Sequence, residues 1–200
     1  MTPPPPRPLA YDGPLLDGEA FREAMSLLAA PIAVITVQDE TGRWRGFTAS
    51  SVTSASLDPP LLTVGVSRTS SCHAALVAAP GFVVNVLGDQ HREVAMRFAT
   101  RGVDRFAAGD FKNWPGSELP CLPDANALYR CVTTDIIPVG DHDLLVGALT
   151  EVSWGNPGEP LLWYRRGFHA PAGTPGAPGA SGDPGAPGRS APSIRRPESM

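Results

Sequence analysis

The chain has 200 residues, of which 16 are Lys or Arg and 20 are Asp or Glu, so its formal net charge is −4 at pH 7. Its interior carries no run of basic residues, which argues against the charged stripe of a nucleic-acid-binding domain. No segment reaches the roughly 18 apolar residues of a membrane span, and the first residues lack the apolar stretch of a signal peptide. We therefore expect a cytoplasmic protein that contacts neither membranes nor nucleic acid.

The composition divides the chain into three parts. Residues 1–16 include Pro3 to Pro6 and Pro8 and are predicted to form a disordered, Pro-rich arm. Residues 17–169 have the mixed composition and the length of one folded domain. In residues 170–200, glycine recurs at every third position from Gly173 to Gly188, which is a collagen-type pattern. So few triplets cannot sustain a triple helix, and we predict a disordered tail.

The predicted elements alternate between strands and short helices. Asp17 is a candidate N-cap for a helix through Phe21 and Met25 that Pro31 ends. The β-branched run Ile32–Gln38 predicts a strand, and the chain returns after a turn as a second strand, Trp44–Ser54. The remaining predicted elements are helices at Ala74–Ala79 and Gln90–Thr100 and strands at Leu61–Ser67, Phe82–Leu87, Ala127–Ile137, Leu144–Trp154 and Leu161–Arg165.

Residues 101–126 carry Gly, Pro and Asp with isolated aromatic residues, and we predict a long loop there, which is typically functional inside a compact domain. The three cysteines, Cys72, Cys121 and Cys131, form no CxxC pair and are odd in number, which indicates reduced thiols. About seven strands with two or three helices indicate a mainly β domain. This pattern does not by itself separate a barrel from a sandwich.

The segment Gly46–Ser71 is the most informative part of the chain. Seven Ser and three Thr fall into two clusters, Thr48–Ser56 and Ser67–Ser71, on either side of an apolar strand. Because each buried hydroxyl needs a hydrogen-bond partner, such clusters suit the wall of a site for a polar or phosphorylated ligand. The second cluster contains Arg68 and runs into a predicted helix, which is an arrangement that can receive an anion. A helix cap followed by a solvated loop explains the same spacing.

Several motifs in order along the chain resemble the flavin reductase family. They are TASSVTSASLDPP from Thr48, VSRTSS from Val66, FVVNVL from Phe82, DRF from Asp104, GDHDLLVG from Gly140 and PLLWYRRGF from Pro160. The similarity covers about residues 21–168. It implies a mainly β, Greek-key split barrel of the FMN-binding type with a few flanking helices. It also implies an NAD(P)H:flavin oxidoreductase, with FMN or FAD and NADH or NADPH as its nucleotides, which forms a homodimer and supplies a partner monooxygenase.

The resemblance also assigns roles to residues of this chain. Thr48, Ala49, Ser50, Ser51 and Ser54 would line the flavin ring, although the family usually has Asn at the position of Ser50. Ser67, Thr69, Ser70 and Ser71 would take the phosphate with Arg68 nearby. Asp104, Arg105 and Phe106 would cover the flavin or the dinucleotide. His142 would lie beside the nicotinamide as the catalytic residue, with Tyr164 placed similarly.

Alternatives remain at this stage. His142 can be an ordinary turn histidine. A metal site formed with its neighbours Asp141 and Asp143 is disfavoured, because adjacent residues of an extended segment point to opposite sides. Cys72 can be a reactive thiol at a helix N-terminus or a small buried residue. Two other functions also fit: a flavoprotein that acts on an organic substrate directly, and a flavin-binding module without turnover.

Overall fold

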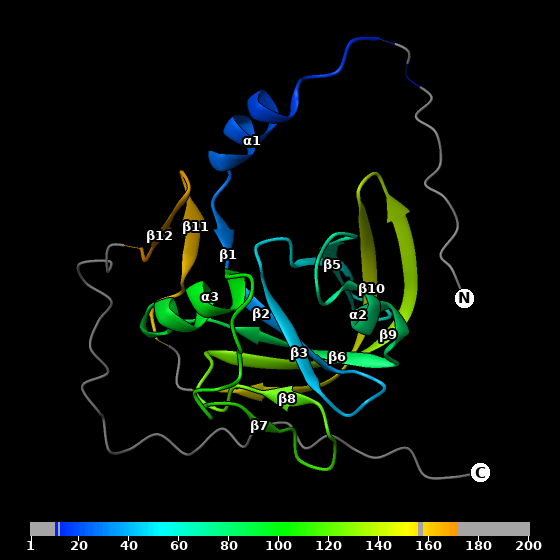
Figure 1. Cartoon of the computed structure of the whole chain (residues 1–200), viewed down its shortest axis with the longest axis vertical. Coiled ribbons are helices and arrows are strands. Elements are labelled where there is room, and N and C mark those ends of the chain that lie inside the picture. The colour runs from blue at the N-terminus through cyan, green and yellow to red at the C-terminus, as the bar shows by residue number, and fades with distance from the viewer. Residues whose placement is uncertain (1–10, 12, 156–157, 172–200) are drawn as a thin grey trace, which may run out of the picture.

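The computed structural model describes residue 11, residues 13–155 and residues 158–171 (Figure 1). Residues 1–10 and 12 of the predicted N-terminal arm and residues 172–200 of the predicted C-terminal tail therefore lie outside the described residues. The chain between them forms α1 (Gly18–Ser26), which stands away from the rest of the domain, and a curled antiparallel sheet (Figure 1). The N-cap prediction is confirmed, because Asp17 Oδ1 accepts hydrogen bonds from the backbone N–H groups of Glu19 and Ala20.

The main sheet has seven strands in the order β3-β2-β6-β9-β10-β5-β4, and every neighbouring pair is antiparallel. The strands are β2 (Ala33–Gln38), β3 (Trp44–Ala49), β4 (Thr53–Ser56), β5 (Leu61–Ser67), β6 (Gly81–Val86), β9 (Ala127–Val139) and β10 (His142–Trp154). The predicted strands therefore exist within a few residues of their expected bounds, with one exception.

The exception is the predicted single strand Trp44–Ser54, which is wrong. The chain leaves β3 at Ala49 and resumes as β4 at Thr53, and these two strands are the opposite edges of the sheet. Only residues 50–52 connect the edges, so the sheet must curl until they approach each other. Ser51 stabilises the connection between the two edges by bonding to β5. Its Oγ accepts a hydrogen bond from Gly65 N–H at 3.1 Å and donates one to the Gly65 carbonyl at 3.2 Å. The result is a barrel that is split between β3 and β4.

Smaller elements cover the barrel. They are α2 (His73–Ala78), the short helix η1 (Asp89–His91), α3 (Arg92–Ala99) and the strands β1 (Ala30–Pro31), β7 (Lys112–Asn113), β8 (Pro120–Cys121), β11 (Leu162–Tyr164) and β12 (Gly167–His169). Strand β11 lies between β1 and β12 in a separate three-stranded sheet. Arg165 and Arg166 form the turn between β11 and β12 with φ values of 47° and 60°.

Two apolar clusters stabilise the barrel. The first includes Ile35, Val64, Phe82 and Leu145, and the second, on the other side of β2 and β6, includes Phe98 of α3. Because β2 and β6 contribute to both clusters, nearly all of their residues are buried. The sequences of these two strands are therefore almost continuously apolar and do not alternate between apolar and polar residues.

The long loop between α3 and β9 packs into the second cluster more tightly than its composition predicts. The Phe106 ring meets those of Phe98 and Phe111 in edge-to-face contacts with centroids 5.1 Å apart. Buried Asn85 ties the loop to the sheet, because its amide donates to the Val34 carbonyl and its oxygen accepts from Leu122 N–H. The prediction of a long loop holds apart from the two-residue strands β7 and β8. None of the helices among the described residues has the length and apolar character needed to cross a bilayer.

Candidate functional site

A hollow of about 660 Å³ lies at the split of the barrel, and we call it the seam pocket. Its walls come from the end of β3, the end of β5, the C-terminal end of α3 and the start of β10. The residues that line it are Phe47, Thr48, Ala49, Ser50, Ser51, Gly65, Ser67, Thr69, Ser70, Ser71, Phe98, Ala99, Arg101, Gly102, Arg105 and His142. Ten of these sixteen belong to the residues predicted from the sequence, so the fold gathers parts of both hydroxyl clusters and His142 of the GDH turn at one place.

The first hydroxyl cluster forms the wall at the seam itself. Ser50 is exposed, whereas Thr48 Oγ1 donates to the Ala95 carbonyl of α3 at 2.6 Å. Together with the bonds of Ser51 to β5, this contact fixes the wall before any ligand binds. The wall therefore presents backbone groups and the Ser50 hydroxyl to a ligand. The hydroxyls of Thr48 and Ser51 also stabilise the barrel through their hydrogen bonds to α3 and β5.

The second hydroxyl cluster forms a tight turn between β5 and α2. Ser67 Oγ lies 3.0 Å from Thr69 Oγ1, and Ser70 Oγ accepts the backbone N–H of Cys72 at 3.3 Å. The helix α2 begins after Cys72 without a side-chain cap, so the Ser70 bond shapes the turn and does not cap the helix, and Ser67, Thr69, Ser70 and Ser71 line the seam pocket. Within the described residues, Ser71 N–H is left without a backbone or side-chain acceptor and can donate to a ligand.

Arg68 does not line the seam pocket, which departs from its predicted place beside the phosphate. Its Nε and Nη2 donate to Asp143 Oδ1 at 3.1 and 2.7 Å, and His73 Nε2 lies 2.6 Å from Asp143 Oδ2. The Asp143 side chain is completely buried. The Arg68 hydrogen bonds hold the pKa of Asp143 below its usual range against the opposing effect of burial. Arg68 therefore anchors the 67–73 turn to β10, and its charge is already neutralised.

Two other arginines line the seam pocket instead. Arg105 was predicted, whereas Arg101 was missed, because nothing in the sequence distinguishes it from other surface arginines. Arg101 is exposed, immediately before Gly102, which has a φ of 77° and turns the chain after α3. Arg105 is fixed by bonds from Nη1 to the Gly46 carbonyl at 2.7 Å and from Nη2 to the Thr100 carbonyl at 3.0 Å. Arg101 and Arg105 therefore bring to the seam pocket the positive charge that Arg68 was predicted to bring.

His142 is the first residue of β10 and faces Ser67 across the ladder with β5. Its side chain is 48% exposed, and Nδ1 lies 2.7 Å from Asp141 Oδ1. If Nδ1 carries the proton in this bond, Nε2 of the neutral ring remains free to accept a hydrogen bond. The neighbour Asp143 turns to the opposite side into its buried pair with Arg68. Asp141, His142 and Asp143 therefore do not converge on a common point.

Four further predicted residues lie outside the seam pocket: Ser54, Asp104, Phe106 and Tyr164. Ser54 is on the edge strand β4, and Phe106 belongs to the aromatic cluster around Phe98. Tyr164 on β11 packs edge-to-face against His169 with ring centroids 5.9 Å apart.

The residues of the seam pocket fit a flavin mononucleotide. An apolar floor from Phe47, Ala49 and Phe98 suits a flat ring, and the hydroxyls with Ser71 N–H suit its polar edge or phosphate. Arg101 and Arg105 balance the negative charge of a phosphate. The three cysteines are free and buried, and burial raises the pKa of Cys131 to about 12, so this thiol is inert.

Comparison with known proteins identifies the family of the chain. Residues 25–172 match the family described as the flavin reductase like domain. An NADH:riboflavin 5'-phosphate oxidoreductase of Streptomyces pristinaespiralis is 53% identical over 162 residues, which cover 80% of this chain and 92% of the relative.

Solved structures show the same relationship. The NADH:FAD oxidoreductase SgcE6 of Streptomyces globisporus C-1027, solved with NAD and FAD fragments, is 29% identical with a TM-score of 0.72, covering 81% of this chain and all of that one. The flavin reductase of styrene monooxygenase from Pseudomonas putida S12 is 30% identical with a TM-score of 0.68, covering 75% and 96%. The chain therefore belongs to the flavin reductase like family, and the predicted mainly β split barrel is confirmed.

Proposed function

We propose that this chain is an NAD(P)H-dependent flavin reductase that releases reduced FMN or FAD to a separate monooxygenase. The observation that supports this function best is the seam pocket, where a half-exposed His142 faces a ring-sized hollow edged by hydroxyls and two arginines. Family membership and the NADH:flavin oxidoreductases among its relatives support the same reaction. The monooxygenase partner is inferred from relatives such as the reductase of styrene monooxygenase.

When bound, the two nucleotides would supply the reactive atoms and the hydride-transfer chemistry between nicotinamide and flavin. The residues of this chain bind and orient them. The 48–51 wall and the Phe98 side hold the ring, and the 67–71 turn with Arg101 and Arg105 holds the phosphate. His142 Nε2 would accept a hydrogen bond from the nicotinamide carboxamide and so orient the nicotinamide without a proton transfer.

We also propose that the protein is a cytoplasmic homodimer. Its three cysteines are all free, as expected in a reducing compartment. The helix α1 exposes Phe21, Met25 and the following Leu28 at 55%, 45% and 61% of their surface. An apolar face of this size on a helix that stands off the barrel needs a partner surface, and a second copy of the chain supplies one (Figure 1).

The reductase proposal makes a direct prediction about turnover. Purified protein is expected to oxidise NADH or NADPH in the presence of excess FMN or FAD, measured as the loss of absorbance of the reduced nicotinamide. Varying the concentration of free flavin separates a flavin substrate, which gives saturation kinetics, from a permanently bound prosthetic group. The absence of flavin-dependent oxidation with either nicotinamide and either flavin would favour a flavin-binding module without turnover.

The dimer proposal predicts that the apolar face of α1 controls oligomeric state. Replacing Phe21 and Met25 together by Glu is expected to convert the dimer to a monomer, measured by sedimentation or light scattering, because two charges cannot be buried unpaired. The matched control is Leu57→Glu, at a residue that is 91% exposed in the turn after β4. A double variant that remains dimeric like the control would place the interface elsewhere.

A further inference from the structure

A second hollow of about 690 Å³ lies next to the seam pocket, and we call it the arginine pocket. It is lined by Gly42, Arg43, Trp44, Arg45, Gly46, Ser71, Cys72, Gly102, Val103, Asp104, Arg105 and Phe106. Three of these residues, Ser71, Gly102 and Arg105, also line the seam pocket. The two hollows therefore meet at the residues that would receive the flavin phosphate.

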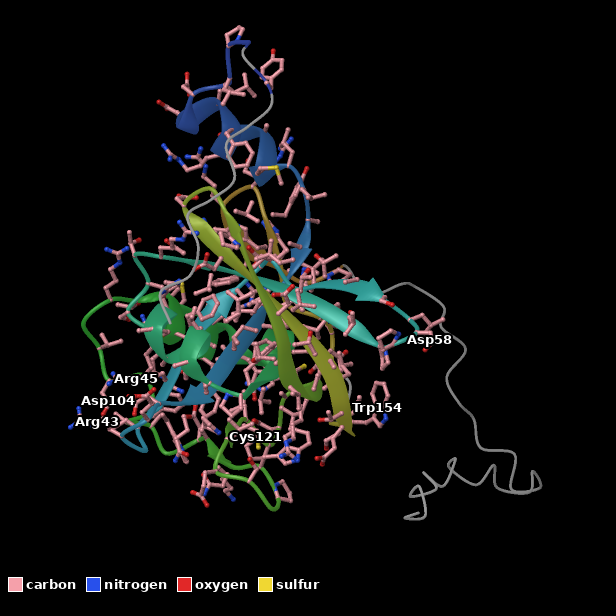
Figure 2. All side chains as sticks on the ribbon, turned by 90° about the vertical axis from the view of Figure 1, so that its right-hand side faces the viewer. Arg43, Arg45, Asp58, Asp104, Cys121 and Trp154 are labelled. Atoms are coloured by element: carbon pink, nitrogen blue, oxygen red, sulfur yellow. The ribbon has the colours of Figure 1, made fainter. Side chains whose placement is uncertain are left out.

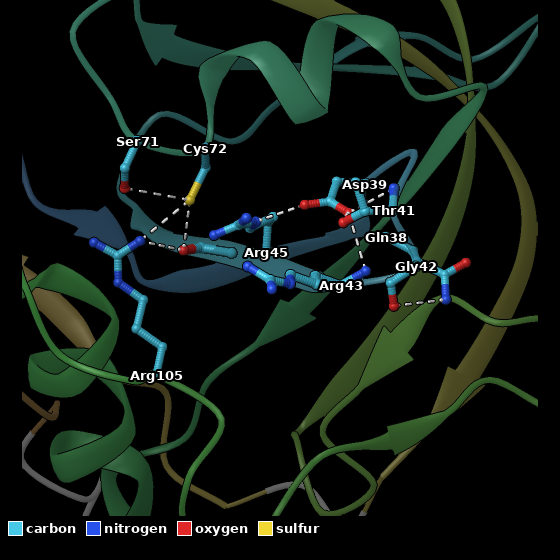
Figure 3. Close-up of polar contacts among 10 residues, drawn as sticks. Gln38, Asp39, Thr41, Gly42, Arg43, Arg45, Ser71, Cys72 and Arg105 are labelled. Atoms are coloured by element: carbon cyan, nitrogen blue, oxygen red, sulfur yellow. Dashed lines mark hydrogen bonds and ion pairs between the residues drawn. The ribbon is translucent and has the colours of Figure 1, made fainter.

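The arginine pocket is positively charged, with three arginines against one aspartate in its lining. Arg45 Nε donates to Asp39 Oδ2 at 2.8 Å, and hydrogen bonds from Thr41 and Arg45 hold the pKa of Asp39 well below its usual range. Asp39 also accepts the backbone N–H of Arg43 at 3.0 Å (Figure 3). The guanidinium of Arg43, in contrast, has no partner among the described residues. It is an exposed cation whose main chain is held in place.

Arg105 stands at the boundary between the two pockets. Its Nη1 donates to the Gly46 carbonyl and to Cys72 Sγ, 3.1 Å away, so the side chain is fixed from the side of β3 and α2 (Figure 3). Cys72 is buried, and its Sγ donates to the Gly46 carbonyl at 3.0 Å, so this thiol has a structural role. Arg105 Nε is buried and has no hydrogen-bond partner within the described part of the chain. A fixed guanidinium at this boundary is placed to meet a bridging anion from either side.

The arginine pocket also contains an aromatic wall. Trp44 and Phe106 pack edge to face with centroids 5.5 Å apart, and both line the hollow while their other sides join the core. Planar bases stack on such residues and on guanidinium groups. Figure 2 shows Arg43, Arg45 and Asp104 gathered at one corner of the molecule, away from Asp58 and Trp154. The arginine pocket thus contains both arginines that can bind a phosphate and a flat apolar wall on which a base can stack.

We infer that the arginine pocket binds the adenylate half of a dinucleotide whose other half occupies the seam pocket. The inference rests on the proposed function, because it takes the seam pocket as the site of the flavin. The pyrophosphate would span the two arginines, with its flavin-side phosphate at Arg105 and its adenylate phosphate at Arg43, and the adenine would lie against the wall of Trp44 and Phe106. FAD and the nicotinamide dinucleotides share this half, and FMN lacks it.

The test compares FAD with FMN in equilibrium titrations followed by tryptophan fluorescence, with no turnover. Arg43→Ala is expected to weaken FAD binding about five- to twentyfold while FMN binding changes less than about twofold. Arg43→Lys is expected to restore most of the FAD affinity. The matched control is Lys112→Ala, which removes a positive charge from a residue that lines neither pocket. Titration with ADP alone is expected to show binding to the parent protein and weaker binding to Arg43→Ala.

Kinetics identify which dinucleotide uses the pocket. If Arg43→Ala leaves the FAD to FMN ratio unchanged but raises KM for NADH at saturating FMN, and not for reduced nicotinamide mononucleotide, the adenylate half is that of the nicotinamide dinucleotide. Equal losses for FAD and FMN, or no loss in either assay, overturn the inference. A parent protein that binds both flavins but oxidises no NADH contradicts the reductase proposal alone, because the binding titrations do not depend on turnover.

Discussion

Replacing Asp143 by asparagine is expected to lower the free energy of unfolding by about 3 kcal/mol at pH 7, because it breaks a buried ion pair and leaves Arg68 without its counter-charge. The Asp143 side chain is fully buried, whereas Arg68 keeps 29% of its side chain exposed, which places the loss at the lower end for such pairs. Urea denaturation followed by circular dichroism measures the change. The matched control is Asp141→Asn, at a 92% exposed side chain two residues earlier, where we expect little change.

The same pair gives a pH dependence with a definite sign. Since the pKa of Asp143 is lower in the folded than in the unfolded protein, its stabilisation is complete above the unfolded value of about 4 and is lost as the pH falls through the folded value. The stability difference between the parent and Asp143→Asn is therefore expected to shrink below about pH 4. A difference that is constant from pH 7 to pH 3 would mean that the ionised carboxylate is not the stabilising group.

Asp143→Asn also affects ligand binding through the 67–73 turn. Arg68 and His73, at the two ends of this turn, both bond to Asp143, so the variant loosens the segment that faces the phosphate. We expect the affinity for FMN to fall more than the affinity for riboflavin, which has no phosphate. Equal affinities in variant and parent would show that Ser71 and the two pocket arginines suffice without this anchor.

Local sequence patterns predicted most of the secondary structure. The cap at Asp17 and the β-branched strand at Ile32–Gln38 depend on neighbouring residues, and both occur as expected. The break after Ala49 does not depend on local sequence, because Thr48–Ser56 has continuous strand character. It arises because β3 and β4 pair with different partners at opposite sheet edges, β2 and β5 respectively. Only the full topology determines where one strand stops and the next begins.

The candidate site was predictable where residues lie together in the sequence and less so where the fold brings in distant ones. Residues 48–51 of the first hydroxyl cluster, four residues of the second and His142 line the seam pocket together. Arg68 was assigned to the phosphate because Asp143, 75 positions later, gives no local sign that it will neutralise it. Phe106 was assigned to a ligand by its place in the DRF motif, and its ring packs with Phe98 outside the seam pocket. Arg101 has no motif, and its place in the pocket depends on how the chain turns at Gly102.

His142→Ala is expected to raise KM for the nicotinamide about three- to tenfold while the dissociation constant of the flavin stays within about twofold. The reason is the position of the ring, at the start of β10 on the rim of the seam pocket, with Nδ1 engaged by Asp141. Nε2 thus remains for a ligand that approaches from outside. Steady-state kinetics at saturating flavin give KM, and fluorescence titration gives the flavin affinity.

His142→Gln separates a hydrogen-bonding role from a steric one, because its amide oxygen can accept from the carboxamide. We expect this variant to recover part of the nicotinamide affinity. The matched control is His169→Ala, which removes an imidazole that lines neither pocket and packs against Tyr164. If flavin binding weakens while KM for the nicotinamide is unchanged, His142 contacts the flavin, and the hydride donor must be oriented by another residue.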